Sequence, residues 1–204
     1  MGKLNLLKAA YYGKVGETVG AKWKDKNTVR VLTVPSNPNT MAQQTVRTVF
    51  RDMSKFVSLF SDQIKTVSAL NTRGMSVRNA IIKMNKQQIM DGTFEARDLV
   101  ISRGGLPTPG GAAATGDQGS GDLTVPLVAI TGSNVTAKAK IVIVAVSAKA
   151  QQAWVKVANN TTASETISTG VTGTDPFDVY IYAIDYRGSA KVGSLSRYQQ
   201  VTPA

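Results

Sequence analysis

The chain has 204 residues, of which 42% are hydrophobic, and its 24 lysines and arginines outnumber its 13 acidic residues to give a net charge of +11. The length and apolar content suffice for a hydrophobic core. Cysteine and histidine are both absent, which excludes disulfides, Cys/His zinc sites, and Ser-His-Asp or Cys-His catalytic systems.

The positive charge is concentrated in the first half, with a net +10 over residues 1–103 and +1 over residues 104–204. The stretch GKVGETVGAKWKDKNTVR, residues 13–30, combines glycines with lysines. Its glycine spacing fits neither phosphate-binding pattern, G-x-G-x-x-G or G-x-x-x-x-G-K-[ST]. The glycines instead indicate tight turns or positive φ angles. The start of the chain does not fit a secretory signal, and no run of 18 apolar residues predicts a membrane span.

Residues 1–39 are expected to form an extended basic arm that binds a partner. Valines and a tryptophan are interleaved with its charges, a pattern that suits a hydrophobic groove on another protein. The alternative is a nucleic-acid strand, held by the cations and stacked on Trp23. The candidate partner-binding residues of the arm are Lys14, Val15, Val19, Lys22, Trp23, Lys24, Lys26 and Arg30.

Residues 40–103 are expected to form a helical hairpin followed by a strand. Thr40 and Gln43 have capping-box spacing, and an apolar stripe from Val46 to Val67 predicts an amphipathic helix of about two dozen residues. Arg47, Arg51 and Lys55 form a basic column on its polar side, and we count them as partner-binding residues. A second helix is expected between a cap at Ser76 and a C-terminal cap at Gly92. The stretch FEARDLVIS reads as the strand.

The glycine-rich segment 104–121 is predicted to be a linker, because it holds seven glycines, two prolines and one charged residue. Short strands separated by turn residues follow, which favours an antiparallel immunoglobulin-like β-sandwich over residues 122–204. Pro126 predicts that its own strand lies at a sheet edge, whereas KIVIVAVS has the composition of a central buried strand. The expected fold class is α+β, with separate hydrophobic clusters for the helices and the sandwich.

Ordered motifs run through the chain: GKVG..VG.KWK.K..VR, NPNT.AQQ, RGMS.RNA, VISRG.LP and VYIYAIDYRGSAKVGSLS. This order resembles an uncharacterised family of small proteins encoded by gut bacteria and their bacteriophages. The resemblance covers nearly the whole chain and implies a basic, helical N-terminal part, an immunoglobulin-like domain and a place in phage particles. The family implies no enzymatic role. The Gly-Ala stretch after Leu106 departs from the family pattern.

The expected function is therefore a non-enzymatic virion protein, made in the bacterial cytoplasm, that is a capsid-decorating, connector or tail component. Its partners would be other virion proteins and copies of itself. Nucleic-acid binding and a bacterial surface or adhesion module are the alternatives.

An enzyme could use Asp175, Asp178 and Asp185, and calcium could bind Asp117 and Asp122, but these aspartates are more typical of turns. We expect no catalytic, cofactor or metal site.

Overall fold

The computed structural model describes residues 13–23, 26–34, 36, 38–70, 74–187 and 190–204. The chain divides into two compact units, Met1–Thr40 and Met41–Ala204.

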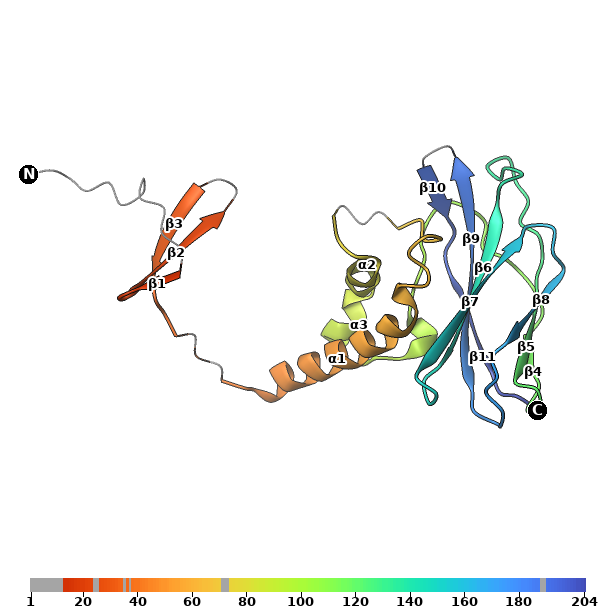
Figure 1. The fold of residues 1–204 in the computed structure, drawn as a ribbon, viewed down its shortest axis with the longest axis horizontal. Coiled ribbons are helices and arrows are strands. Elements are labelled where there is room, and N and C mark those ends of the chain that lie inside the picture. Colours follow the sequence, from red (N-terminus) through yellow and green to blue (C-terminus); the bar gives the residue numbers. More distant parts are fainter. Residues whose placement is uncertain (1–12, 24–25, 35, 37, 71–73, 188–189) are drawn as a thin grey trace, which may run out of the picture. The chain divides into compact units, whose positions relative to one another are not determined.

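The first unit contains a three-stranded antiparallel sheet of β1 (Gly13–Val15), β2 (Thr18–Trp23) and β3 (Lys26–Val31), in that order (Figure 1). Gly16 has a φ of 58° in the turn between β1 and β2, a conformation that favours glycine. The expected positive-φ glycines are thus confirmed at Gly13 and Gly16. The segment expected to be a single extended arm does form extended strands. These strands pair with one another in a sheet, however, instead of continuing as one arm. We call this element the N-terminal sheet.

The second unit begins with the predicted amphipathic helix, α1 (Met41–Ser61). Its apolar stripe is buried from Val49 through Phe60. The second expected helix is divided at Asn85 into α2 (Val77–Met84) and α3 (Lys86–Asp91). Both predicted caps are confirmed: the Ser76 side chain accepts the N–H of Asn79, and Gly92 ends α3 with a φ of 75°.

Two antiparallel sheets form the β-sandwich. The larger sheet has the order β10-β9-β6-β7, with β11 also paired to β9, and the smaller sheet has the order β4-β5-β8. The strands of the larger sheet are β6 (Lys140–Ser147), β7 (Gln152–Asn159), β9 (Phe177–Arg187), β10 (Ala190–Gly193) and β11 (Arg197–Val201). Those of the smaller sheet are β4 (Thr115–Gly116), β5 (Asp122–Pro126) and β8 (Ser164–Ser168). The fold class is therefore α+β with an immunoglobulin-like sandwich.

Two expectations about strand position have opposite outcomes. The central position of KIVIVAVS is confirmed, because β6 lies between β9 and β7. The edge position predicted from Pro126 is wrong, because β5 lies between β4 and β8. Pro126 is the last residue of β5 and β4 pairs only with Leu123 and Thr124, so the proline leaves that pairing intact.

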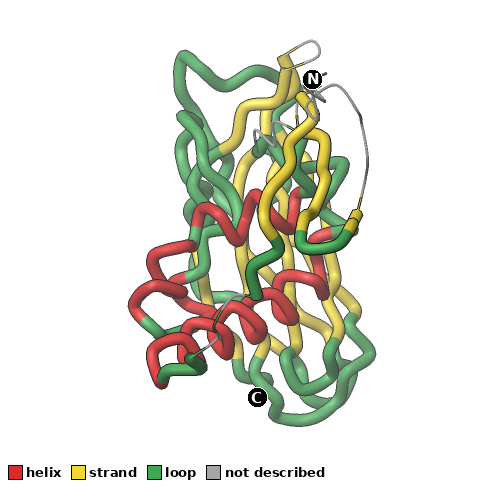
Figure 2. Tube along the Cα trace, turned by 90° about the vertical axis from the view of Figure 1, so that its left-hand side faces the viewer, coloured by secondary structure: helices red, strands yellow, loops and turns green. Residues whose placement is uncertain are grey.

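The helices form a third layer against the outer face of the larger sheet (Figures 1 and 2). One hydrophobic cluster joins Phe56 and Phe60 of α1 to Val144 and Tyr182 of the sheet. A second cluster, including Leu123, Ile143 and Ile181, fills the space between the two sheets. The expectation of separate helical and sandwich clusters is therefore wrong. β6 and β9 are apolar on both faces because each face packs against another layer.

Residues 94–102, FEARDLVIS, do not form the expected strand. A 3₁₀ turn at Ala96–Asp98 precedes buried Leu99 and Ile101. The Asn85 side chain bonds both the N–H and the C=O of Val100, at 2.8 Å each. The Ile101 N–H donates to the Ser196 hydroxyl at 3.0 Å. Burial of Leu99 and Ile101 resembles the pattern of a strand. The backbone groups of Val100 and the N–H of Ile101, however, form hydrogen bonds with side chains and not with a neighbouring strand.

Segment 104–121 is not a free linker. The Leu106 N–H donates to the Gly193 carbonyl at 3.1 Å, and Leu106 itself is buried. A Cβ on Gly104 would lie 2.0 Å from the Gly193 carbonyl oxygen. Glycine is therefore needed at position 104 for close packing of two backbones, which composition alone cannot distinguish from flexibility.

Candidate protein-interaction surfaces

The strand register gives the N-terminal sheet two different faces. Residues directly opposite in antiparallel strands project to the same face, and neighbours along a strand alternate. Val15, Thr18 and Val31 form one row across the three strands. Gly13, Gly20 and Val29 form another row on the same side. We call this side the valine face; Lys22 and Asn27 pair at its far end.

The opposite side is the basic face. Lys14, Val19 and Arg30 form a row across the strands. Lys26 lies four residues before Arg30 in β3, and side chains alternate along a strand, so both side chains project from this face. Six of the expected partner-binding residues thus divide between two faces: Val15 and Lys22 lie on the valine face, and Lys14, Val19, Lys26 and Arg30 on the basic one.

Trp23 and Lys24 are special cases among the expected site residues. The backbone of Trp23 pairs with Lys26 at the end of β2, but its side chain lies outside the described residues. Lys24 lies wholly outside them.

The N-terminal sheet has no buried side chain among its described residues. Gly20 is the one buried residue that the structure describes there. Val15 is 57% exposed and Val31 is 67% exposed. A three-stranded sheet normally needs an apolar face covered by another layer for stability. Sequence reasoning identified Val15 but did not include Val31, although the alternation in NTVRV is a signal for it.

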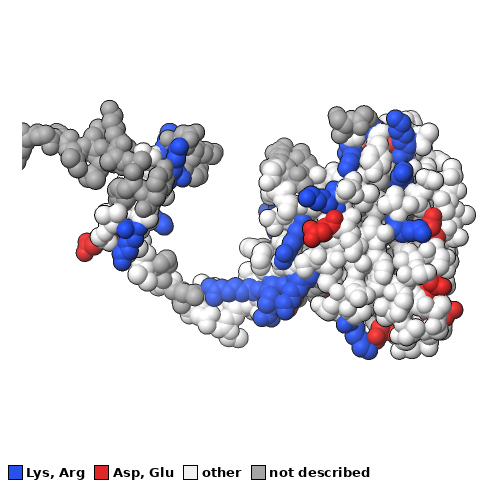
Figure 3. Space-filling model, viewed as in Figure 1, with Lys and Arg blue, Asp and Glu red and all other residues white. Residues whose placement is uncertain are grey.

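The basic column on α1 is a second surface. Figure 3 shows lysine and arginine gathered over this helix. Arg47, Arg51 and Lys55 are all exposed, as expected. The Arg51 Nε lies 3.2 Å from Asp52 Oδ1, and both side chains are about half or more exposed. Such an exposed pair contributes little to stability, about 0–1 kcal/mol, so the column remains a charged surface.

Apolar side chains beside this column extend the buried stripe of α1 toward its N-terminus. Val46 and Phe50 lie three residues before Val49 and Met53, on the same side of the helix. Phe50 is nevertheless 48% exposed. Sequence periodicity predicted both residues as inward-facing, but the other described helices and sheets of the second unit do not cover the first turns of α1.

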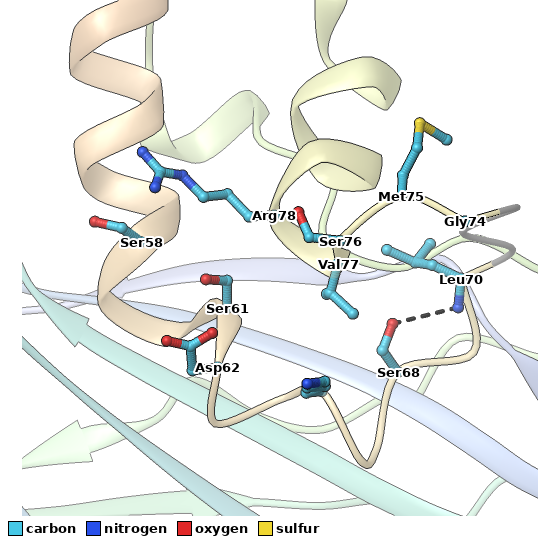
Figure 4. Close-up of a pocket in the computed structure, with 11 residues that line it drawn as sticks. Ser58, Ser61, Asp62, Ser68, Leu70, Gly74, Met75, Ser76, Val77 and Arg78 are labelled. Atoms are coloured by element: carbon cyan, nitrogen blue, oxygen red, sulfur yellow. Dashed lines mark hydrogen bonds between the residues drawn. The ribbon is translucent and has the colours of Figure 1, made fainter.

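A pocket of about 660 Å³ opens between the end of α1 and the start of α2 (Figure 4). Its polar groups largely serve local structure: the Leu70 N–H donates to the Ser68 hydroxyl at 3.3 Å, and Ser76 caps α2. Asp62 and Lys65 are exposed side chains of its lining. We assign no reaction to this pocket.

The carboxylates considered for catalysis have separate partners. The Asp175 Oδ1 lies 2.7 Å from Lys149 Nζ at the surface. The Tyr198 hydroxyl donates to Asp178 Oδ1 at 2.7 Å. Burial raises the pKa of Asp178, and the bond from Tyr198 opposes that rise. Burial and the bond to Asp178 raise the pKa of Tyr198 above its usual range.

Asp185 is fully buried and holds the loop before β6. It accepts the Thr136 N–H at 3.1 Å and also the Thr136 hydroxyl. Burial alone would raise the pKa of Asp185, but the bonds from Thr136 and Arg187 outweigh burial and lower it. These interactions are structural.

The expected turn role of Asp117 is confirmed, because its Oδ1 accepts the N–H groups of Gly119 and Ser120 at 2.7 and 3.2 Å. Across the part of the chain that the structure describes, no three acidic side chains are grouped as metal ligands would be. None of the described helices is long and apolar enough to span a membrane.

None of the family models and none of the curated proteins compared with the sequence matches it. Among solved structures, the FN1–FN3 domains of chicken CNTN1 are similar with a TM-score of 0.37 and 11% sequence identity. That match covers 50% of this chain and 35% of the chicken chain.

Proposed function

We propose that the protein is a non-enzymatic structural subunit of a bacteriophage particle and binds neighbouring subunits through the N-terminal sheet and the exposed side of α1. The observation that carries the proposal is the N-terminal sheet, which has a valine face but no described core. Burial of apolar area on a partner would stabilise it at about 25 cal/mol per Å². The uncovered Phe50 beside the basic column of α1 supports a second contact.

The family resemblance in the ordered sequence motifs supports a phage particle as the setting. A capsid-decorating, connector or tail role fits a subunit whose sandwich has its own core and whose N-terminal sheet lacks one. The basic face also suits an alternative, nucleic-acid binding through Lys14, Lys26 and Arg30. Charge alone would not require a valine face on the other side of the same sheet.

The decisive experiment is incorporation of variants into phage particles, measured by mass spectrometry of purified virions. Deleting residues 1–40, or replacing Val15 and Val31 by serine, should strongly reduce incorporation. Thr28→Ser in the same sheet is the matched control and should incorporate normally.

DNA binding at two salt concentrations should accompany the incorporation assay. Tight binding that falls steeply with salt, together with full incorporation of the valine variant, would replace the subunit proposal with the nucleic-acid one. Absence of the wild-type protein from virions would reject a particle role altogether.

A further inference from the structure

We propose that the outer edge of β3 binds an extended segment of another protein, in which apolar and acidic residues alternate, by adding that segment as a fourth strand. The inference rests on the proposed function and names the chemistry of the partner at the same site.

The peptide groups of β3 provide the first argument. β3 is last in the order β1-β2-β3, and no described strand pairs with its outer side. The Leu32 N–H donates inward to the Glu17 carbonyl at 2.7 Å. Peptide groups alternate in direction along an antiparallel strand, so those of Asn27, Val29 and Val31 point away from β2. An exposed edge of this kind is a template for strand addition.

The two faces specify the side chains of the added strand. On one side it would lie beside Val29 and Val31, where apolar residues extend the valine face. On the other it would lie beside Lys26 and Arg30, where acidic residues provide charge complementarity. Opposite-charge and apolar cross-strand pairs each contribute about 0.2–1 kcal/mol. Strict alternation of apolar and acidic residues matches both faces at once.

Charge complementarity favours an acidic strand over a second copy of β3, because β3 contains no acidic residue to face Lys26 or Arg30 in any register. Two β3 strands paired antiparallel, centred on Thr28, would place Lys26 of each copy opposite Arg30 of the other. Like charges directly opposite one another are destabilising. Nucleic acid would use the basic face but leave the outward peptide groups and the valine face uncovered. A protein strand in which acidic and apolar residues alternate would pair with the outward peptide groups and extend both the valine face and the basic face.

The test uses the full-length protein and three fluorescein-labelled peptides of one length, in which valine alternates with glutamate, valine with lysine, or serine with glutamate. Anisotropy should show binding of the valine–glutamate peptide and at least about tenfold weaker binding of each other peptide, equivalent to 1.4 kcal/mol. Equal binding of the serine–glutamate peptide would overturn the inference, because charge alone would then suffice.

Two variants locate the contact. Val29→Pro removes one outward N–H, which an edge strand tolerates, and should weaken binding about tenfold or more. Val29→Thr keeps that N–H and is the matched control. The double variant Lys26→Glu with Arg30→Glu contains no proline and should reverse the preference toward the valine–lysine peptide. Retained preference for the acidic peptide in this double variant would contradict the proposal even if Val29→Pro disturbs the sheet.

The peptide and particle assays separate the two proposals. If no peptide binds but deletion of residues 1–40 abolishes incorporation, strand addition at β3 is rejected and the subunit function stands. If the deletion leaves incorporation unchanged, the N-terminal sheet is rejected as a contact between subunits, and the peptide preferences alone decide whether β3 binds an acidic strand.

Discussion

The N-terminal sheet and the larger sheet of the sandwich are built from similar strands but differ in what covers them. β6 and β9 are buried almost throughout, since helices pack on one face and the smaller sheet on the other. The N-terminal sheet instead exposes Val15 and Val31 and leaves Val19 and Val29 only partly buried. The second unit therefore contains its own stabilising layers, whereas the described part of the first unit contains none.

The largest effect is expected when one apolar side chain is shortened or replaced in each region, the sandwich with its helices and the N-terminal sheet. Phe60 is fully buried between α1 and the larger sheet, so Phe60→Ala should lower the free energy of unfolding by about 3–5 kcal/mol. Val31→Ser in the N-terminal sheet should change it by less than about 0.5 kcal/mol in the free protein. Denaturant titration measures both. Similar losses would mean that the valine face is already covered within the chain.

The next test concerns segment 104–121, which composition predicts to be loose and the structure shows to be packed. Gly104→Ala should destabilise the protein by about 1–3 kcal/mol through steric overlap with Gly193. Gly105→Ala is the matched control, because its added Cβ would meet no atom within 4 Å. Thermal unfolding of the two variants gives the comparison. An unchanged Tm for Gly104→Ala would restore the linker interpretation.

A smaller, pH-dependent effect is expected at Asp185. Its lowered pKa stabilises the fold above the ordinary carboxyl pKa, and that contribution is lost as pH falls through the lower folded-state pKa. Thr136→Val should therefore cost about 1–2 kcal/mol at pH 7, and less below about pH 4. Urea titrations at several pH values measure the difference from wild type. A cost that is equal at pH 7 and pH 2.5 would show that packing, rather than the carboxylate, is responsible.

The smallest effect is expected from removing the first unit. A chain beginning at Met41 should unfold within about 0.5 kcal/mol of the full chain, since both hydrophobic clusters of the sandwich and helices lie within residues 41–204. Calorimetry of the two proteins measures this difference.

Brief proteolysis should produce the same fragment by cutting within residues 32–40 before residues 104–121, because the described residues of the former segment are exposed. An early cut in 104–121 would contradict the packed arrangement.

Local signals predicted those elements whose structure depends on nearby residues. The stripe of α1, the cap at Ser76 and the left-handed Gly92 are set by spacing along one helix. The predictions that proved wrong concern residues whose hydrogen-bonding or packing partners are distant in the sequence. Val100 looked like part of a strand because it lies in the apolar run Leu99–Ile101, yet the Asn85 side chain supplies its hydrogen bonds.

The candidate interaction surface was predicted only in part, since composition identified a basic, valine-containing segment but not its pairing. Register alone separates Val15, Val29 and Val31 from Lys26 and Arg30, because a shift by one residue would exchange the faces. The uncovered Phe50 could not be recognised either, since the same periodicity continues into the buried part of α1.

The sequence by itself determined the charge asymmetry, the amphipathic helix, the turn positions and the succession of short strands, because these depend on residue type and local spacing. Only the tertiary structure decided that the helices cover the sandwich, that Gly104 packs against Gly193, and that Val15, Val29 and Val31 lie opposite Lys14, Lys26 and Arg30 in one small sheet. These outcomes depend on contacts between residues distant in the chain, whose energies come from shared burial and backbone pairing rather than from local preference.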